Sequence, residues 1–228
     1  MKTLLQFCLI SLTLLLSCKK EISLPYTFTG KVRNINGNPV VDATINLSAY
    51  YRGGVLSGGG FNQIASAKTD NAGNFRVSFN FDSSAKNFMI QVFADNYFPL
   101  FNESIFPSDI QQNTLDKTLM LYKLSTIKIN FKNTSPTSST DNFSVFQTNE
   151  LFGPSFNTFI ERQFAGGAFN ELEHRYIGDN ITGYELTKTK GDTYTIINWT
   201  SKKNGILKYV IDSIFIAGSS QGNYNINY

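Results

Sequence analysis

His174 is the only histidine in the sequence, and histidine is the side chain most often used for general acid–base catalysis. Any Ser–His–Asp or Cys–His mechanism would therefore have to use it. It lies in "ELEHRY" (171–176), close to Glu171 and Glu173, and no nucleophile is recognisably paired with it. The residue types and their spacing predict no catalytic residue and no enzyme. A hydrolase that depends on His174 is the least favoured alternative.

Metal binding is the second chemistry to consider for this segment. On a strand, Glu171 and Glu173 would point to one face and His174 to the other. One histidine and two carboxylates at this spacing match no standard metal site. The stretch "DNAG" (70–73) lacks the density of oxygen ligands found in a calcium loop, so it predicts a hairpin turn. We expect no metal and no cofactor.

The composition indicates a folded, all-β protein. Hydrophobic residues make up 41% of the 228 residues and charged residues 16%, which is typical of a chain that buries a core. Aromatic residues reach 14%, and their abundance favours strands. The net charge of +3 is spread along the chain with small basic clusters at 19–20, 188–190 and 202–203. No basic stripe suits a nucleic acid, so we expect no nucleic-acid partner.

Residues 1–17 have the form of a secretory signal peptide. Lys2 precedes an apolar stretch from Leu4 to Leu16 that is too short to span a bilayer comfortably. The stretch leads through Ser17 into Cys18, an arrangement that resembles the lipobox of bacterial lipoproteins. This resemblance implies removal of residues 1–17, lipid on the Cys18 sulfur, and a membrane partner through that lipid. Residues 18–25 would then form a lipidated tether.

The cysteine count agrees with this interpretation. Cys8 would leave with the signal peptide, so Cys18 would be the only cysteine of the mature chain and no internal disulfide could form. Two or more acyl chains hold a protein stably on a membrane. Lys19 stands where an Asp can retain lipoproteins in the inner membrane of Gram-negative bacteria. The resemblance therefore implies the outer membrane, with the protein on its cell-surface or periplasmic side.

Residues 26–123 show the period-two alternation of strands that bury one face. The segments 41–49, 73–81 and 87–95 carry this pattern. Their expected inward residues are Val41, Ala43, Ile45, Leu47, Ala49, Phe75, Val77, Phe79, Phe81, Phe88, Ile90, Val92 and Ala94. Turn-forming residues at Asn36-Gly37 and at 70–73 connect the segments. We predict a β-sandwich domain over 26–123.

The same residues resemble a known family. "GKVRNINGNPVVDATINL" (30–47) and "AKTDNAGNFRVSF" (67–79) are similar to the carboxypeptidase regulatory-like domain, a transthyretin-like β-sandwich. The residues that carry the resemblance are Gly30, Val32, Gly37, Pro39, Ala43, Ile45, Thr69, Asp70, Gly73 and Phe75. It implies a non-catalytic domain of the kind found in peptidases, transporters and surface proteins. No peptidase is attached in this chain, so it implies no regulation of one in cis.

A glycine-rich segment, "YYRGGVLSGGGFN" (50–62), lengthens one connection of this domain. It lacks the Gly-Lys-Ser/Thr ending and the strand–loop–helix context of a phosphate-binding loop. Two interpretations stay open, a plain flexible excursion and an exposed recognition loop. In the second, Tyr50, Tyr51 and Arg52 would be the ligand-binding residues, since loops on rigid scaffolds often carry binding.

Residues 124–228 predict a second β-sandwich domain in tandem. Alternation restarts at 125–133, and the hairpin of 193–216 turns at Asn204-Gly205. "NYNINY" (223–228) reads as a last strand. Residues 143–171 are aromatic and punctuated by Gly and Pro, and the sequence gives no strand layout for 143–192. The aromatics of 143–169 would either form core or, where exposed, a binding surface.

These observations predict a non-enzymatic, lipid-anchored envelope protein. It would act as a binding or structural module at the outer membrane, with an envelope protein or an extracellular glycan as its partner. The alternative is a structural or adhesion subunit, because fimbrillin-type pilins are similar in outline: they are lipoproteins with two transthyretin-like domains.

Overall fold

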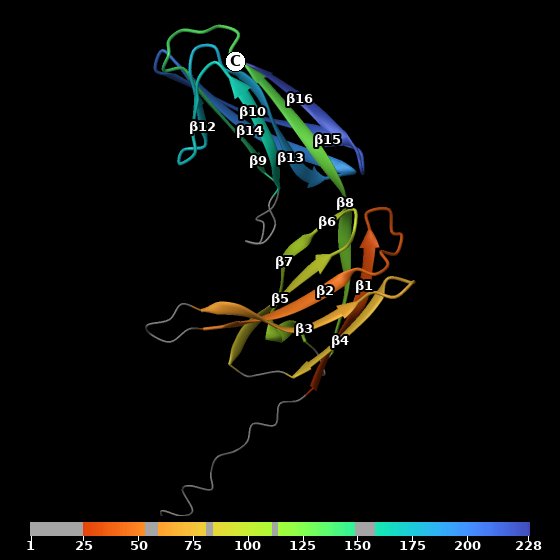
Figure 1. Ribbon diagram of the computed structural model, residues 1–228. Coiled ribbons are helices and arrows are strands. Elements are labelled where there is room, and N and C mark those ends of the chain that lie inside the picture. Colours follow the sequence, from red (N-terminus) through yellow and green to blue (C-terminus); the bar gives the residue numbers. More distant parts are fainter. Residues whose placement is uncertain (1–24, 53–58, 81–83, 111–113, 149–157) are drawn as a thin grey trace, which may run out of the picture.

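The computed structural model describes residues 25–52, 59–80, 84–110, 114–148 and 158–228, and within them the protein is all-β (Figure 1). They form sixteen strands and one short 3-10 helix, η1 (Pro107–Asp109), and no α-helix. The strands are β1 (Pro25–Asn34), β2 (Thr44–Tyr51), β3 (Gly60–Lys68), β4 (Asn74–Asn80), β5 (Ala85–Phe93), β6 (Tyr97–Phe98), β7 (Leu100–Ile105), β8 (Thr114–Lys132), β9 (Asn142–Thr148), β10 (Phe159–Ala165), β11 (Ala168–Asn170), β12 (Arg175–Ile177), β13 (Thr182–Lys190), β14 (Thr193–Lys203), β15 (Ile206–Ile216) and β16 (Gln221–Asn227). The predicted all-β class is confirmed.

The first half of the chain builds a β-sandwich around its own core. One layer has the order β4-β1-β8, in which β1 runs antiparallel to β4 and parallel to β8. The other layer has the order β3-β2-β5-β7. The buried side chains between them form one cluster that includes Phe28, Ile45, Phe75 and Phe88. Four phenylalanines contribute to this core, and its other buried residues are aliphatic.

The second half builds another pair of layers. One has the order β10-β13-β8-β16, and the other has the order β11-β12-β9-β14-β15. Their buried cluster is separate from the first and includes Ile127, Phe143, Tyr176 and Trp199. In the described part of the 143–192 segment, which the sequence left unplaced, the strands are β9 to β13.

Strand β8 belongs to both halves and runs through them without a break (Figure 1). Along its length it pairs with β1 over 114–121, with β6 at 122–123 and with β13 over 124–132. The backbone N–H of Leu124 donates to the Asn96 carbonyl (2.8 Å), and the N–H of Gly191 donates to the Lys123 carbonyl (2.7 Å). The predicted boundary between residues 123 and 124 thus falls inside a strand. The division into two domains there stays a prediction.

Most of the local alternation in the first half appears as the sequence predicts. Phe75, Val77 and Phe79 point inward from β4, while Phe81 lies outside the described residues. Val41 is a correction, because it is 43% exposed. Its neighbour Asp42 has a φ of 57°, so the backbone turns there and β2 starts only at Thr44.

The predicted turns have the expected chemistry. The Asp70 carboxylate accepts hydrogen bonds from the backbone N–H groups of Ala72 (2.9 Å) and Asn74 (2.8 Å). Gly73 closes that turn with a φ of 72°. These hydrogen bonds, that from Asn74 first, hold the Asp70 pKa below its ordinary value. The turn predicted for 70–73 is confirmed, but the predicted hairpin is wrong: the turn joins β3 to β4, which lie in different layers and pair with β2 and β1 instead of with each other.

Candidate functional site

A carboxylate lies between the two layers of the second half. Strand β13 turns Glu185, Thr187 and Thr189 toward the interior, and all three side chains are buried. Thr189 and Thr195 share a hydrogen bond of 2.7 Å between their hydroxyls. A charged residue in this row needs partners, because an unpaired buried charge is strongly unfavourable.

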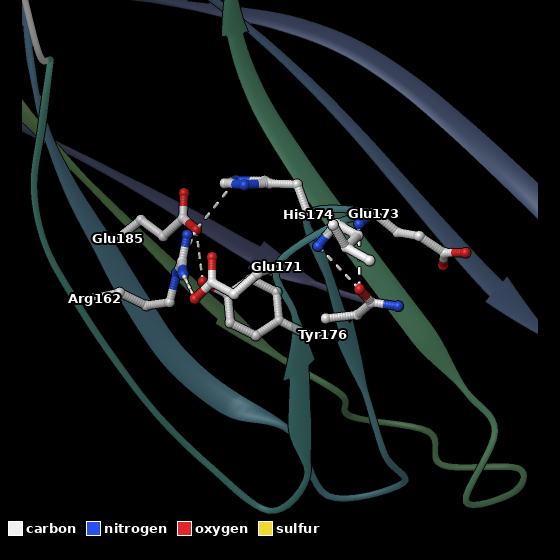
Figure 2. Close-up of polar contacts among 8 residues, drawn as sticks. Arg162, Glu171, Glu173, His174, Tyr176 and Glu185 are labelled. Atoms are coloured by element: carbon white, nitrogen blue, oxygen red, sulfur yellow. Dashed lines mark hydrogen bonds and ion pairs between the residues drawn. The ribbon is translucent and has the colours of Figure 1, made fainter.

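Three side chains from both layers converge on one oxygen of Glu185 (Figure 2). The Nε of Arg162, directly opposite on β10, lies 3.0 Å from Glu185 Oε1. The hydroxyl of Tyr176, from β12 in the other layer, donates to the same oxygen at 2.6 Å. His174 Nε2 lies 3.6 Å from it. We call Arg162, His174, Tyr176 and Glu185 the Glu185 network.

Arg162 is enclosed by aromatic rings as well as by carboxylates. Its Cζ lies 3.6 Å from the centroid of Phe169 and 5.1 Å from that of Phe159. Its Nη1 also lies 3.5 Å from Oε1 of the exposed Glu171. A guanidinium stacked on ring faces keeps a favourable environment while it is largely removed from water. The network therefore fixes β10 and β12 to β13.

The electrostatics of the network suit binding and positioning better than proton transfer. Burial, and then the nearby Glu185 charge, raise the pKa of the Tyr176 hydroxyl well above its usual range. Tyr176 therefore stays a neutral hydrogen-bond donor. Glu185 Oε1 already accepts hydrogen bonds from Arg162 and from Tyr176, so these two contacts occupy it as an acceptor.

A pocket opens beside the network. It has a volume of about 160 Å³, and its lining residues come from β8, β9, β10, β13 and the turn before β12. Aromatic walls are supplied by Phe146 and Phe159, and polar groups by Gln147, His174, Glu185 and Thr187. The contacts of Glu185 with Arg162, His174 and Tyr176 all go to one carboxylate oxygen, Oε1 (Figure 2). An apolar wall with a few converging polar groups is the usual character of a small-molecule site.

His174 sits in a turn, not on a strand. Residues 171–174 form the turn that joins β11 to β12, and His174 has a φ of 49°. Its ring lies 5.4 Å from Phe146 and 5.2 Å from Phe169, between centroids. Glu173 points away and pairs with Arg175 Nη1 at 3.1 Å. Across the described part of the chain, no three His, Cys, Asp or Glu residues gather as metal ligands.

Sequence reasoning overlooked one pattern, the Gly-x-Ser-x-Gly string "GSSQG" at 218–222. In hydrolases this pattern presents a serine between a strand and a helix. Here it joins β15 to β16, and the Ser220 hydroxyl donates to the Ala217 carbonyl at 2.6 Å. The string therefore forms a β-turn and lacks the geometry of a nucleophile.

A second candidate surface covers the outer face of β9, β14 and β15. The pairing register puts alternate residues of these strands on one face, where seven large apolar side chains are exposed. They are Phe146, Tyr194, Ile196, Leu207, Tyr209, Ile211 and Phe215, and we call them the apolar face. Exposed apolar side chains gathered on one face of a sheet mark interaction sites on soluble domains.

The predicted ligand-binding residues of the first half lie mainly in β2. Tyr50 and Tyr51 pair with Phe61 and Gly60 of β3 and are half-buried. Tyr51 packs against the first core, and the Tyr50 ring lies 5.1 Å from that of Phe61. Arg52 is exposed at the strand end. Residues 53–58 and Cys18 lie outside the described residues, so ligand binding and lipidation stay predictions.

Of the Glu185 network, the sequence singled out only His174. Arg162 and Glu185 are 23 positions apart in the chain, and only the β10–β13 register brings them together. The aromatics of 143–169 divide as the two open interpretations allowed. Phe143 is core, whereas Phe146 is 48% exposed.

Comparison with protein families and with characterised proteins found no match to this sequence. Solved structures do resemble it in shape. A shaft pilin, SpaA, from Lactobacillus rhamnosus GG is 10% identical, and the match covers 90% of this chain and 99% of the pilin with a TM-score of 0.35. The major pilin SpaD from Corynebacterium diphtheriae is 11% identical over 85% of this chain and 65% of its own, with a TM-score of 0.33.

A chlorocatechol dioxygenase from Rhodococcus opacus also matches, at 13% identity and a TM-score of 0.33. That match covers 46% of this chain and 62% of the enzyme, so the chain spans less than two thirds of its length. Likeness at these scores carries no argument about function. No helix among the described residues is long and apolar enough to cross a membrane.

Proposed function

We propose that this protein is a non-enzymatic subunit of the cell envelope that acts by associating with another protein chain. It would be a structural or adhesion subunit, fimbrillin-like in outline. The observation that supports this most is the apolar face of β9, β14 and β15, which exposes seven large apolar side chains on one side of a sheet. Covering such a surface with a partner removes apolar side chains from water and so lowers the free energy.

The position of this face supports the proposal. In Figure 1 the first described strand, β1, starts at one end of the molecule, and β14 and β15 lie in the opposite half. With lipid on Cys18, the first sandwich, which we propose to be carboxypeptidase regulatory-like, would be nearest the membrane. The apolar face would then lie in the half of the molecule farther from the outer membrane, and another envelope or surface protein could contact it there.

The test replaces two rings at one end of the apolar face. Tyr194 and Phe215 contact each other with centroids 5.5 Å apart, so a Tyr194→Ser/Phe215→Ser variant removes their apolar surface together. Cross-linking on intact cells should capture a partner with the wild type and lose it with this variant. Phe61→Ser, which removes an exposed ring from β3, is the matched control and should keep the partner. Equal capture by all three proteins would refute the proposal.

A second candidate function is saccharide binding in the pocket beside the Glu185 network. Rings at Phe146 and Phe159 could stack on a sugar, while His174, Glu185 and Thr187 could bind its hydroxyl groups. An extracellular glycan would then be the partner. Wild type should bind a saccharide in a calorimetric panel and Phe146→Ala should not. Absence of binding by the wild type across the panel would exclude this candidate.

A further inference from the structure

β15 is an edge strand of unusual length. Its eleven residues, Ile206–Ile216, pair with β14 in one continuous register, and within the described residues no strand pairs with its other edge. Natural edge strands are usually short or protected by proline, bulges or several charges. β15 has no proline, no bulge against β14, and only two charged residues, Lys208 and Asp212.

We propose that β15 pairs antiparallel with β15 of a second copy of this chain, about a two-fold axis at Val210. The proposal goes beyond association through the apolar face, because it uses the backbone edge of β15 and leaves that face open. It joins the sheets of the two copies into one continuous sheet.

The hairpin geometry says which backbone groups face the open edge. Asn204 and Gly205 have φ values of 48° and 78°, the two positive values of a two-residue type I′ turn. In such a hairpin the flanking residues, Lys203 and Ile206, form a hydrogen-bonded pair, and the ladder alternates from there. Residues of β15 with odd numbers therefore point their N–H and C=O groups outward. Tyr209 and Ile211 are the central two of these.

Charge selects the register. With the axis at Val210, Lys208 of each copy lies opposite Asp212 of the other, which gives two opposite-charge pairs. Moving the axis to residue 208 or 212 would put two lysines or two aspartates face to face, which is unfavourable. An axis at residue 209 or 211 leaves both charges without a charged partner. Only the Val210 register pairs every charge on the strand.

The side chains at the centre of this register also suit each other. Tyr209 of one copy lies opposite Ile211 of the other, on the outer face of the sheet. Aromatic and β-branched residues facing each other across strands stabilise a sheet. The same outward N–H and C=O groups of Tyr209 and Ile211 would form the hydrogen bonds between the copies. Sequence, register and backbone geometry thus favour the same pairing.

Cysteine cross-linking of the full chain on cells tests the register. Two Val210 residues would form a non-hydrogen-bonded pair with Cα atoms about 4.5 Å apart, a separation that a disulfide can bridge. Val210→Cys should therefore give a covalent dimer under mild oxidation. Leu207→Cys is the matched control, since two copies of residue 207 would be about 20 Å apart along the strands. Equal dimer from both variants would overturn the proposal.

Charge and backbone variants supply an independent measurement on the full-length protein in detergent. Lys208→Asp should raise the dimer dissociation constant about tenfold or more, and Lys208→Asp/Asp212→Lys should recover much of it. Ile211→Pro removes an outward N–H and should abolish the dimer while the monomer stays folded. An unchanged dissociation constant in all three would overturn the pairing. So would a Val210→Cys protein that captures only a different protein, even though association through the apolar face would then stand.

Discussion

Arg162 and Glu185 stand opposite each other on β10 and β13, with 3.0 Å between Nε and Oε1. Both side chains are largely buried, and the second carboxylate that contacts Arg162, that of Glu171, is exposed. Removing one partner of such a pair leaves an uncompensated charge, whereas replacing both by apolar residues is often neutral. The pair therefore stabilises the second half, and because Glu185 also lines the pocket, the pair holds part of the pocket wall in place.

The first prediction concerns this pair. Glu185→Leu should lower the free energy of unfolding by about 3–5 kcal/mol, because Arg162 would lose its buried carboxylate partner and keep only the exposed Glu171. Arg162→Met/Glu185→Leu should lose less than the sum of the two single variants. Urea unfolding followed by Trp199 fluorescence measures this, since Trp199 is buried in the same core. Strict additivity of the two single variants would contradict the coupling.

The second prediction concerns a glycine in β1. A Cβ at Gly30 would collide with the backbone carbonyl of Lys117 on β8 and would lie 3.0 Å from the Phe75 ring. Gly30→Ala should therefore lower the free energy of unfolding by about 2–3 kcal/mol. Gly60→Ala is the control, because its Cβ would have nothing within 4 Å, and it should change little. Thermal unfolding followed by circular dichroism separates the two, and matching Tm values would refute the argument.

The sequence predicts the first half better because its signals are local. Alternation at Phe75, Val77 and Phe79 needs only the period of a strand, and the turn at 70–73 needs only its own side chains. Neither depends on distant residues. Both appear in the structure, and the all-β class follows from many such segments.

The candidate site was harder to predict from the sequence, because it depends on pairing between strands that are distant in the chain. In "TGYELTKTK" (182–190) alternation would turn either Tyr184 and Leu186 or Glu185 and Thr187 inward. In the structure Glu185 and Thr187 are buried, because Arg162 and Tyr176, which lie on other strands, donate hydrogen bonds to Glu185. Nothing local signals those partners.

The apolar face could not be predicted from the sequence for a different reason. β15 reads "ILKYVIDSIFI", which is apolar at both odd and even positions, so its pattern does not say which side is buried. The register with β14 decides this, and Leu207, Tyr209 and Ile211 come to lie outside. The apolar residues at both odd and even positions were the signal available in the sequence, whereas the edge position of β15 follows only from the strand pairing.

The third prediction is a pH dependence at Asp141. Burial tends to raise the pKa of this carboxyl, but hydrogen bonds from Thr137 and Asn133 and the charge of Lys203 outweigh it and lower the pKa overall. The Thr137 backbone N–H lies 2.8 Å away and the Asn133 Nδ2 3.1 Å away. A carboxyl with a lowered pKa in the folded state stabilises it above the unfolded pKa, and this stability is lost as pH falls through the folded value.

Asp141→Asn should therefore cost about 2 kcal/mol at pH 7, and the difference from wild type should shrink as the pH falls below about 4. Urea unfolding at a series of pH values measures both proteins under the same conditions. A difference that is constant from pH 7 to pH 3 would show that the charge of Asp141 does not contribute.

The fourth prediction concerns the anchor on which the proposed function depends. If Cys18 carries lipid, labelled fatty acid should enter the wild type, and Cys18→Ala should take up none and leave the membrane fraction. The Cys18→Ala protein should still fold, because the cores of both halves are built from residues beyond 25. Its fluorescence and unfolding curve should match the wild type. Equal labelling of the two proteins would refute lipidation at Cys18, and association through the apolar face would then have to be explained without a membrane tether.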